Sequence, residues 1–90
     1  MNSPRIYTVQ LERRAEREIR NLPQHIINRI DNTFQQLRNN PRPPGVVKLS
    51  GQIGDSWRIR VGAYRILYRI DDENYRVKIY RIKHRGRAYR

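Results

Sequence analysis

With 90 residues, of which 37% are hydrophobic and 31% charged, the chain can form a single compact domain over residues 1–90, but not a large buried catalytic cavity. No apolar run approaches the ~18 to 20 residues of a membrane span and no signal-peptide pattern is present, so we expect a cytoplasmic protein without a membrane partner. The lack of cysteine excludes disulfides, a thiol nucleophile and thiolate metal ligands. Twenty Lys and Arg residues against eight Asp and Glu give a formal net charge of +12, which is typical of proteins that bind a polyanion such as nucleic acid.

The first predicted elements are a strand and a helix. Residues 5–11 alternate between polar and apolar side chains, which predicts a strand. In residues 12–21 apolar side chains recur at helical spacing, which predicts a helix with one apolar stripe. The stripe consists of Leu11, Ala15, Ile19 and Leu22. Glu16 and Arg20 lie one helical turn apart, in an arrangement that favours an ion pair.

A second helix is predicted from Pro23 to about Arg38. Proline ends the first helix and suits the first position of the next one. The strongest periodic signal in the sequence lies here, and we assign its members to the core: Ile26, Ile27, Ile30, Phe34 and Leu37. Because the connection between the helices is very short, we expect an antiparallel helical hairpin that covers one face of a sheet.

Residues 39–56 are predicted to be mainly a connector. The prolines and the glycine of residues 39–45 cannot continue a helix and form a stiff spacer. Residues 46–49 could extend along the sheet. The loop over residues 50–56 contains glycines but lacks the Gly-Lys-Ser/Thr ending and the following helix of a nucleotide-binding P-loop, so we do not expect one.

Residues 57–70 predict two strands around a turn, with a cationic surface on one side. Alternation places Arg58 and Arg60 on one face of the first strand and apolar side chains on the other. If the strands pair with their apolar faces together, four arginines line the open face: Arg58, Arg60, Arg65 and Arg69. We expect the aromatic residues of the hairpin to pack in the core, since they share the apolar parity: Trp57, Tyr64 and Tyr68.

The basic residues are concentrated in this half of the chain. Residues 57–90 hold 11 basic and 3 acidic residues, whereas residues 1–56 hold 9 and 5. Most of them are arginines, whose guanidinium groups bind phosphate in a planar, bidentate way. The arginine-lined face of the hairpin is therefore the candidate site.

The last predicted element is a strand from residue 75 to about residue 83. It follows an acidic turn at residues 71–74, whose carboxylates we expect to be solvated. Ile82 falls out of alternation with the earlier apolar residues, which indicates a bulge or the end of the strand near Tyr80 and Arg81. The predicted fold is α+β, in the order strand, helix, helix and three strands, with an antiparallel-rich sheet and the helical hairpin packed on one face.

The chemistry that these side chains support is narrow. The chain has only two histidines, His25 and His84, and no cysteine. It also lacks a carboxylate pair with catalytic spacing and a cluster of carboxylates that could hold a metal, so most hydrolase mechanisms are excluded and we expect no metal and no cofactor. Arg, Lys, Tyr and His nevertheless suffice to cleave RNA, because RNA carries its own nucleophile, the 2′-hydroxyl. The protein needs to align it, stabilise the charge of the transition state and assist proton transfers.

Four short motifs carry a family resemblance that spans nearly the whole chain. They are Lys48-Leu49-x-Gly51, Trp57-Arg-Ile-Arg-Val-Gly, Tyr64-Arg-Ile-Leu-Tyr-Arg-Ile-Asp71 and a His84-Arg85 tail that ends in Tyr89. Together with the order of the elements, they resemble the RelE/ParE toxin superfamily, and its RelE branch more than its ParE branch. The resemblance implies a ribosome-dependent, metal-independent endoribonuclease that cuts mRNA in the ribosomal A site. The alternatives are a gyrase-inhibiting toxin, as in ParE-like relatives, and a non-catalytic RNA-binding module.

The resemblance also implies which residues act on the RNA. The family's catalytic positions fall on Arg58, Arg60, Arg65, Arg85 and Tyr89. Some RelE members have lysine at the two strand positions, but arginine practically cannot lose its proton, so Arg58 and Arg60 are expected to stabilise phosphate. Proton transfer then falls to Tyr89 or His84, with Arg85 supporting the leaving group. His84 is equally compatible with capping the end of a strand.

Further basic residues and partners complete the expectation. The residues expected to bind RNA outside the catalytic set are Lys48, Arg69, Lys83 and Arg87. Gly86 interrupts the tail, so Arg87 competes with Arg85 for the family's arginine position, and Arg85 fits better. The implied partners are the 70S ribosome with its mRNA and a RelB-like antitoxin that forms a hetero-oligomer with the toxin. An acidic and apolar antitoxin segment would cover the arginines or displace the tail.

Overall fold

In the computed structural model, which describes residues 6–51 and 55–86, the elements follow the order β1, α1, α2, β2, β3, β4 and β5. The strands are β1 (Thr8–Leu11), β2 (Val47–Lys48), β3 (Ser56–Val61), β4 (Tyr64–Asp71) and β5 (Arg76–His84). The helices are α1 (Arg13–Arg20) and α2 (Gln24–Asn39). The predicted α+β fold is confirmed, and the short β2 lies where the sequence allowed an extended segment.

The strands form one sheet in the order β1-β5-β4-β3-β2. Only β1 and β5 run parallel, so the sheet is antiparallel-rich, as predicted. β2 pairs with β3 at two positions only, Val47 with Arg58 and Lys48 with Trp57. Within the described residues, β3 therefore has no strand neighbour on its outer side from Ile59 onward.

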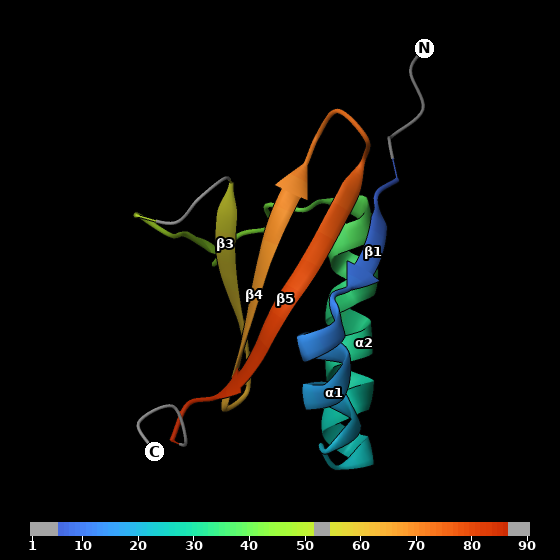
Figure 1. Ribbon diagram of the computed structural model, residues 1–90, viewed down its shortest axis with the longest axis vertical. Helices are drawn as coiled ribbons and strands as arrows, with labels where there is room; N and C mark the ends of the chain where they lie inside the picture. The colour runs from blue at the N-terminus through green and yellow to red at the C-terminus, as the bar shows by residue number, and fades with distance from the viewer. Residues whose placement is uncertain (1–5, 52–54, 87–90) are drawn as a thin grey trace.

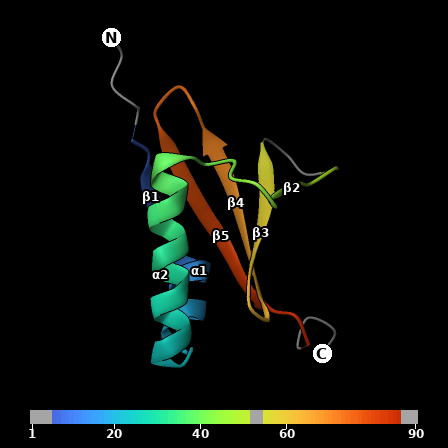
Figure 2. The ribbon, with the colours of Figure 1, turned by 180° about the vertical axis from the view of Figure 1, so that it is seen from behind.

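The helices form the predicted antiparallel hairpin and lie side by side along the β1 and β5 side of the sheet (Figures 1 and 2). α2 begins directly after Pro23, which has extended backbone and occupies the N-cap, one position before the predicted one. The carbonyl oxygen of Pro23 accepts hydrogen bonds from the N–H groups of Ile26 and Ile27, both at 3.0 Å. Proline thus begins the helix without a capping side chain.

The core lies between the helices and one face of the sheet. Its buried members are Ala15, Ile30, Phe34, Leu37, Val61, Ile66, Tyr68, Ile70, Val77, Ile79 and Ile82. They include residues from both predicted helical stripes, although Ile27 is only half-buried. Trp57 and Tyr64 pack against this core as predicted. The buried Tyr68 hydroxyl donates a hydrogen bond to the Pro41 carbonyl oxygen at 2.8 Å, and burial raises the pKa of Tyr68.

Of the two alternatives predicted near Tyr80 and Arg81, the structure has the bulge, and β5 continues to His84. Leu67 of β4 lies opposite Arg81, and the next residue, Tyr68, lies opposite Ile79, so Tyr80 is the extra residue. The extra residue shifts the alternation of side chains along the strand. Ile82 consequently returns to the core face, where it is 4% exposed.

Beyond the end of β1, α1 lies along β5, and its Glu18 side chain binds the backbone of that strand. One carboxylate oxygen of Glu18 accepts a hydrogen bond from the Ile82 N–H at 2.7 Å, and the other accepts one from Arg81 Nε at 3.0 Å. The predicted pair of Glu16 and Arg20 is also present, at 3.0 Å. Among the described residues, neither helix is long and apolar enough to cross a membrane.

Candidate functional site

The register of three neighbouring strands gathers basic side chains on the sheet face opposite the core. Arg60 of β3 pairs with Arg65 of β4, which pairs in turn with Lys83 of β5. Cross-strand partners share a face, and their Cβ atoms lie about 5 Å apart. We call the surface around this row the cationic face, and its basic residues include Arg58, Arg60, Arg65, Arg69, Lys78, Arg81 and Lys83.

The turn between β3 and β4 holds this arrangement in place. Gly62 has a φ of 58°, in the left-handed region that favours glycine. A Cβ atom there would also lie 2.9 Å from Nη1 of Arg29, so the guanidinium group from α2 lies against the turn. On the other side, the Arg85 N–H donates a 2.7 Å hydrogen bond to the Ala63 carbonyl oxygen, which brings the end of β5 to the turn (Figure 1).

The cations of this face divide into two groups by their partners. Two are paired with carboxylates near the start of the chain: Arg69 with Glu12 at 3.4 Å and Arg81 with Glu18 at 3.0 Å. In the described ranges, no carboxylate lies within ion-pair distance of the others: Arg58, Arg60, Arg65, Lys78 and Lys83. Like charges directly opposite one another on a sheet are destabilising. The row of Arg60, Arg65 and Lys83 is therefore suited to hold an anion.

A groove of about 450 Å³ opens beside the unpaired edge of β3. Its lining residues are Gln36, Pro44, Gly45, Arg58, Ile59 and Arg60. Two of the predicted catalytic arginines thus border both the cationic face and a hollow large enough for part of a polymeric ligand.

His84 lies away from the cationic face. It pairs with Tyr64, whose neighbours Ile66 and Tyr68 define the core side, and its ring stands edge-on to the Tyr64 ring at 5.0 Å. Its Nδ1 accepts a 3.0 Å hydrogen bond from the Gly86 N–H. Of the two roles expected for His84, capping the end of the strand is the one that these contacts support.

The remaining predicted site residues are distributed as follows. Lys48 pairs with Trp57 and so lies on the opposite side of the sheet from Arg58, 3.9 Å from a carboxylate oxygen of Asp55. Arg85 is exposed beside the hairpin turn. Arg87 and Tyr89 lie outside the described residues. Within the part of the chain that the structure describes, no three His, Asp or Glu residues gather closely enough to hold a metal ion.

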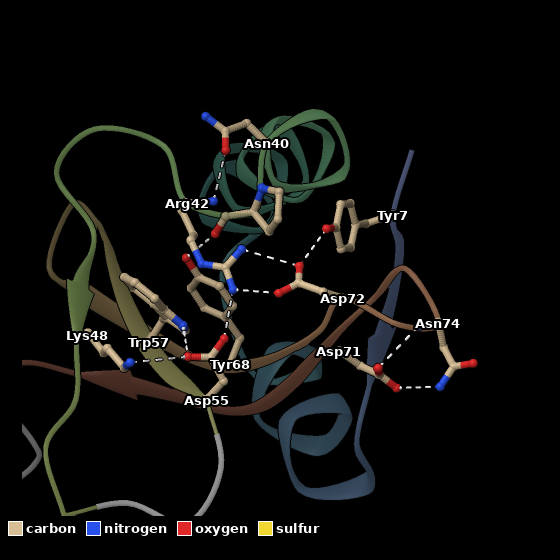
Figure 3. A network of polar contacts seen from close by, with 11 residues as sticks. Tyr7, Asn40, Arg42, Lys48, Asp55, Trp57, Tyr68, Asp71, Asp72 and Asn74 are labelled. Carbon is tan, nitrogen blue, oxygen red and sulfur yellow. Dashed lines mark hydrogen bonds and ion pairs between the residues drawn. The ribbon is translucent and has the colours of Figure 1, made fainter. Parts of the chain in front are cut away.

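A polar network at the far end of the hairpin was not anticipated from the sequence (Figure 3). Its centre is Arg42, in the connector that was predicted to be a spacer only. One guanidinium nitrogen of Arg42 lies 2.8 Å from Asp55 and 2.8 Å from Asp72, and the guanidinium group lies 5.3 Å from the centre of the Trp57 ring. Tyr7 donates a 2.6 Å hydrogen bond to the same Asp72 carboxylate.

This network shifts the pKa values of Asp72 and Tyr7. The hydrogen bonds from Arg42 and Tyr7 hold the pKa of Asp72 below its ordinary value, and the bond to Asp72 raises the pKa of Tyr7. The Asp72 carboxylate is exposed, as predicted for this turn, but its pairing with Arg42 was not predicted. Nothing in the sequence marks this contact, because one arginine between prolines carries no periodic signal and its partners lie 13 and 30 residues away.

Known proteins resemble this chain in sequence and in fold. A family model described as the ParE toxin of type II toxin–antitoxin systems, parDE, matches residues 6–89. Toxin RelG of Mycobacterium tuberculosis is 36% identical over 85 residues, which cover 93% of this chain and 97% of that protein. Toxin RelE of the same organism is 33% identical over 91 residues, which cover 100% of this chain and 93% of that protein.

Solved structures share the fold as well, and two of them are toxin–antitoxin complexes. In the RelE–RelB complex of the archaeon Pyrococcus horikoshii OT3, a chain with 30% sequence identity superimposes with a TM-score of 0.81, over 92% of this chain and 99% of that chain. In the toxin–antitoxin complex RelBE2 of Mycobacterium tuberculosis, the matching chain is 34% identical, with a TM-score of 0.78 over 89% and 99% of the two chains.

The Arg42 network generates a prediction about stability and pH. Because the pKa of Asp72 is lower in the folded than in the unfolded chain, this group stabilises the fold above its unfolded pKa of about 3.9, and the contribution is lost as the pH falls through the folded pKa. We expect Asp72→Asn to lower the free energy of unfolding at pH 7 by about 1 kcal/mol. The difference in the free energy of unfolding between the variant and the wild type, measured by urea unfolding, should disappear as the pH falls from about 5 to about 2.

Glu73→Gln is the matched control, since Glu73 lies in the same turn, is exposed and has no ion-pair partner among the described residues. Its free energy of unfolding should equal that of the wild type from pH 7 to pH 2. A constant gap between Asp72→Asn and the wild type from pH 7 to pH 2 would contradict the assignment of this stability to the carboxylate.

Proposed function

Because the chain belongs to the ParE toxin family and, within the RelE/ParE superfamily, to the RelE-like branch of type II toxin–antitoxin toxins, we propose that it is an endoribonuclease that cuts mRNA in the ribosomal A site. The observation that carries the proposal is the row of Arg60, Arg65 and Lys83, flanked by Arg58, with no carboxylate partner in the described ranges. Such a row offers several cationic donors to one phosphodiester group.

The proposed reaction uses the ribose as nucleophile. The 2′-oxygen attacks the adjacent phosphorus, the new 2′-O–P bond forms, and the P–O5′ bond breaks. The proton of the 2′-hydroxyl passes to a base on the enzyme, and a second proton reaches the departing 5′-oxygen. The products are a 2′,3′-cyclic phosphate and a 5′-hydroxyl end. The protein contributes mainly by fixing the reacting groups and by stabilising negative charge on the phosphoryl oxygens.

The residues take the following roles in this proposal. Arg58, Arg60 and Arg65 stabilise the transition state, because guanidinium groups stay protonated and can bind phosphoryl oxygens in a bidentate way. Arg85, beside the hairpin turn, supports the leaving group. Proton transfer rests with Tyr89, which the family resemblance supports, since Nδ1 of His84 is already an acceptor and its ring lies on the core side.

The proposal includes partners and location. Two solved structures with at least 30% identity to this chain are toxin–antitoxin complexes, which supports a cognate RelB-like antitoxin and a toxin–antitoxin hetero-oligomer. The 70S ribosome and its mRNA are the proposed targets, and the cytoplasm is the proposed location.

Gyrase inhibition is the second candidate function, because the matching family model carries the description ParE toxin. Induced expression followed by mapping of mRNA 5′ ends and of DNA breaks separates the two candidates. Truncated mRNAs with ends in phase with codons support the nuclease, and double-strand DNA breaks without mRNA cleavage support the gyrase inhibitor.

The first prediction from this function concerns the cationic row. Arg65→Ala and Arg58→Ala should each reduce ribosome-dependent cleavage by roughly 10²-fold or more, the scale of losing one transition-state charge donor. The measurement is the rate of mRNA cleavage on programmed ribosomes, monitored by primer extension. Arg17→Ala is the charge-matched control on the exposed surface of α1 and should cleave like the wild type. Equal losses of cleavage rate in all three folded variants would show that cleavage depends on the total charge of the protein and not on these particular arginines.

A second prediction concerns the ends of the product. The upstream fragment should end in a 2′,3′-cyclic phosphate and the downstream fragment in a 5′-hydroxyl, because the 2′-oxygen is the nucleophile. Polynucleotide kinase with labelled ATP should therefore label the downstream fragment without prior phosphatase treatment. A 5′-phosphate on that fragment would mean that water attacked the phosphorus, and the proposed mechanism would be wrong.

A third prediction concerns the antitoxin. A partner that binds only the folded toxin stabilises it by mass action, so coexpression with the product of the adjacent small reading frame should raise the melting temperature by about 10 °C or more at saturating partner. The same partner should suppress toxicity. If the chain is harmless alone and gains neither a partner nor stability, the toxin function fails and an RNA-binding module becomes the better explanation.

A further inference from the structure

Four buried side-chain polar atoms have no hydrogen-bond partner in the part of the chain that the structure describes. They are Ser56 Oγ, Arg58 Nε, Arg65 Nε and the Tyr80 hydroxyl. Buried polar atoms in proteins are nearly always partnered, so each exception needs an explanation. Two of these residues, Ser56 and Tyr80, belong neither to the core nor to the catalytic set proposed above.

All four residues lie on the cationic face. Ser56 pairs with Arg69 and lies two positions before Arg58 on β3, so it shares their face. Tyr80 is the extra residue of the β5 bulge, and its ring lies 4.1 Å from the Arg69 guanidinium carbon. The unpartnered atoms thus come from three adjacent strands and one side of one sheet.

Ser56 and Tyr80 extend the site from the hairpin turn toward the base of the hairpin. Ser56 and Arg60 are four residues apart on β3, which corresponds to about 13 Å in a strand. Stacked nucleotides rise by about 3.4 Å each, so this length accommodates more than one nucleotide. Ser56 is 1% exposed, so its hydroxyl is covered by its neighbours, and a ligand reaches it when the longer Arg69 side chain opposite it on β4 moves aside.

The chemistry of these atoms specifies the ligand. The Nε–H groups of Arg58 and Arg65 can only donate, and hydroxyl groups donate readily to a charged acceptor. Their surroundings are cationic, because Arg69 and Lys78 occupy the neighbouring positions on β4 and β5. The complementary ligand is therefore an anion with several acceptor oxygens.

We propose that the hydroxyl groups of Ser56 and Tyr80 bind a second RNA phosphodiester, next to the one that is cleaved at Arg60 and Arg65. This inference rests on the proposed function and adds two uncharged contacts to its binding site. Arg69 covers the Tyr80 ring in the free protein, and its ion pair with Glu12 has both side chains exposed, at 41% and 46%. Such a pair contributes little, so an RNA phosphate can replace Glu12 as the partner of Arg69 and uncover the Tyr80 hydroxyl.

Removing the hydroxyl groups tests this proposal. Tyr80→Phe and Ser56→Ala each delete one hydroxyl and keep the charge of the protein. The affinity for a short fluorescein-labelled single-stranded RNA, measured by fluorescence anisotropy, should fall about tenfold in each variant, the scale of a lost hydrogen bond to a charged group. The slope of affinity against salt concentration should stay unchanged, because no charge is removed.

The melting temperature separates a ligand contact from a structural one. Since neither hydroxyl has a partner in the free protein, its removal should leave the melting temperature equal to or above that of the wild type. Tyr64→Phe is the matched control, because it removes a tyrosine hydroxyl from the opposite face of the same sheet. It should bind RNA like the wild type. Wild-type affinity in Tyr80→Phe and Ser56→Ala, or a clear fall in their melting temperatures, would overturn the proposal.

Cleavage on programmed ribosomes distinguishes failure of this inference from failure of the proposed function. If the wild type cuts mRNA and both hydroxyl variants cut it at the wild-type rate, the second phosphodiester site is wrong and the nuclease function stands. If the wild type does not cut mRNA, but both variants lose affinity for RNA while Tyr64→Phe does not, the nuclease function fails and the RNA contact is supported.

Discussion

The pairing register of β3, β4 and β5 is the constraint on which the candidate site depends. On the core side it stacks Ile59, Ile66 and Ile82 across the three strands, and the latter two are almost fully buried. A slip of one residue would turn these side chains to solvent, so their burial fixes the register. The same register forces Arg60, Arg65 and Lys83 into one row on the opposite face. The hydrophobic core thus offsets the repulsion among the cations, and the sheet holds them close together in the absence of a ligand.

The bulge at Tyr80 decides which side chains of β5 reach this face. With regular alternation from Val77 and Ile79, Lys83 would lie on the core side and His84 on the cationic face. The extra residue reverses both positions, so that Lys83 pairs with Arg65 and His84 packs on Tyr64. The location of the bulge could be predicted from the sequence, because Ile82 fell out of alternation. Its effect on His84 requires the pairing partners, which alternation within one strand does not specify.

Local pattern predicted the helical hairpin, the strands and the arginines of the cationic face, since each follows from periodicity over a few residues. The contacts of Arg42 could not be predicted in this way. They join the connector to Asp55 and Asp72, which are distant in sequence and come together only when the sheet and the helices are assembled. The pairing of Arg69 with Glu12 and of Arg81 with Glu18 is of the same kind, because it depends on how α1 lies along β5.

The hairpin is held at both ends, and this bears on how the site works. At its base, Arg42 links the residues before β3 and after β4 through Asp55 and Asp72. At its turn, the Arg29 guanidinium lies against Gly62, and the Arg85 N–H bonds to Ala63. Electrostatic stabilisation of a transition state is effective when the charged donors are already in position, because no free energy is then spent on moving them during the reaction. A hairpin fixed at its base and at its turn keeps Arg58, Arg60 and Arg65 on a rigid scaffold. In such a site the protein can leave the nucleophile to the RNA and contribute chiefly position and charge.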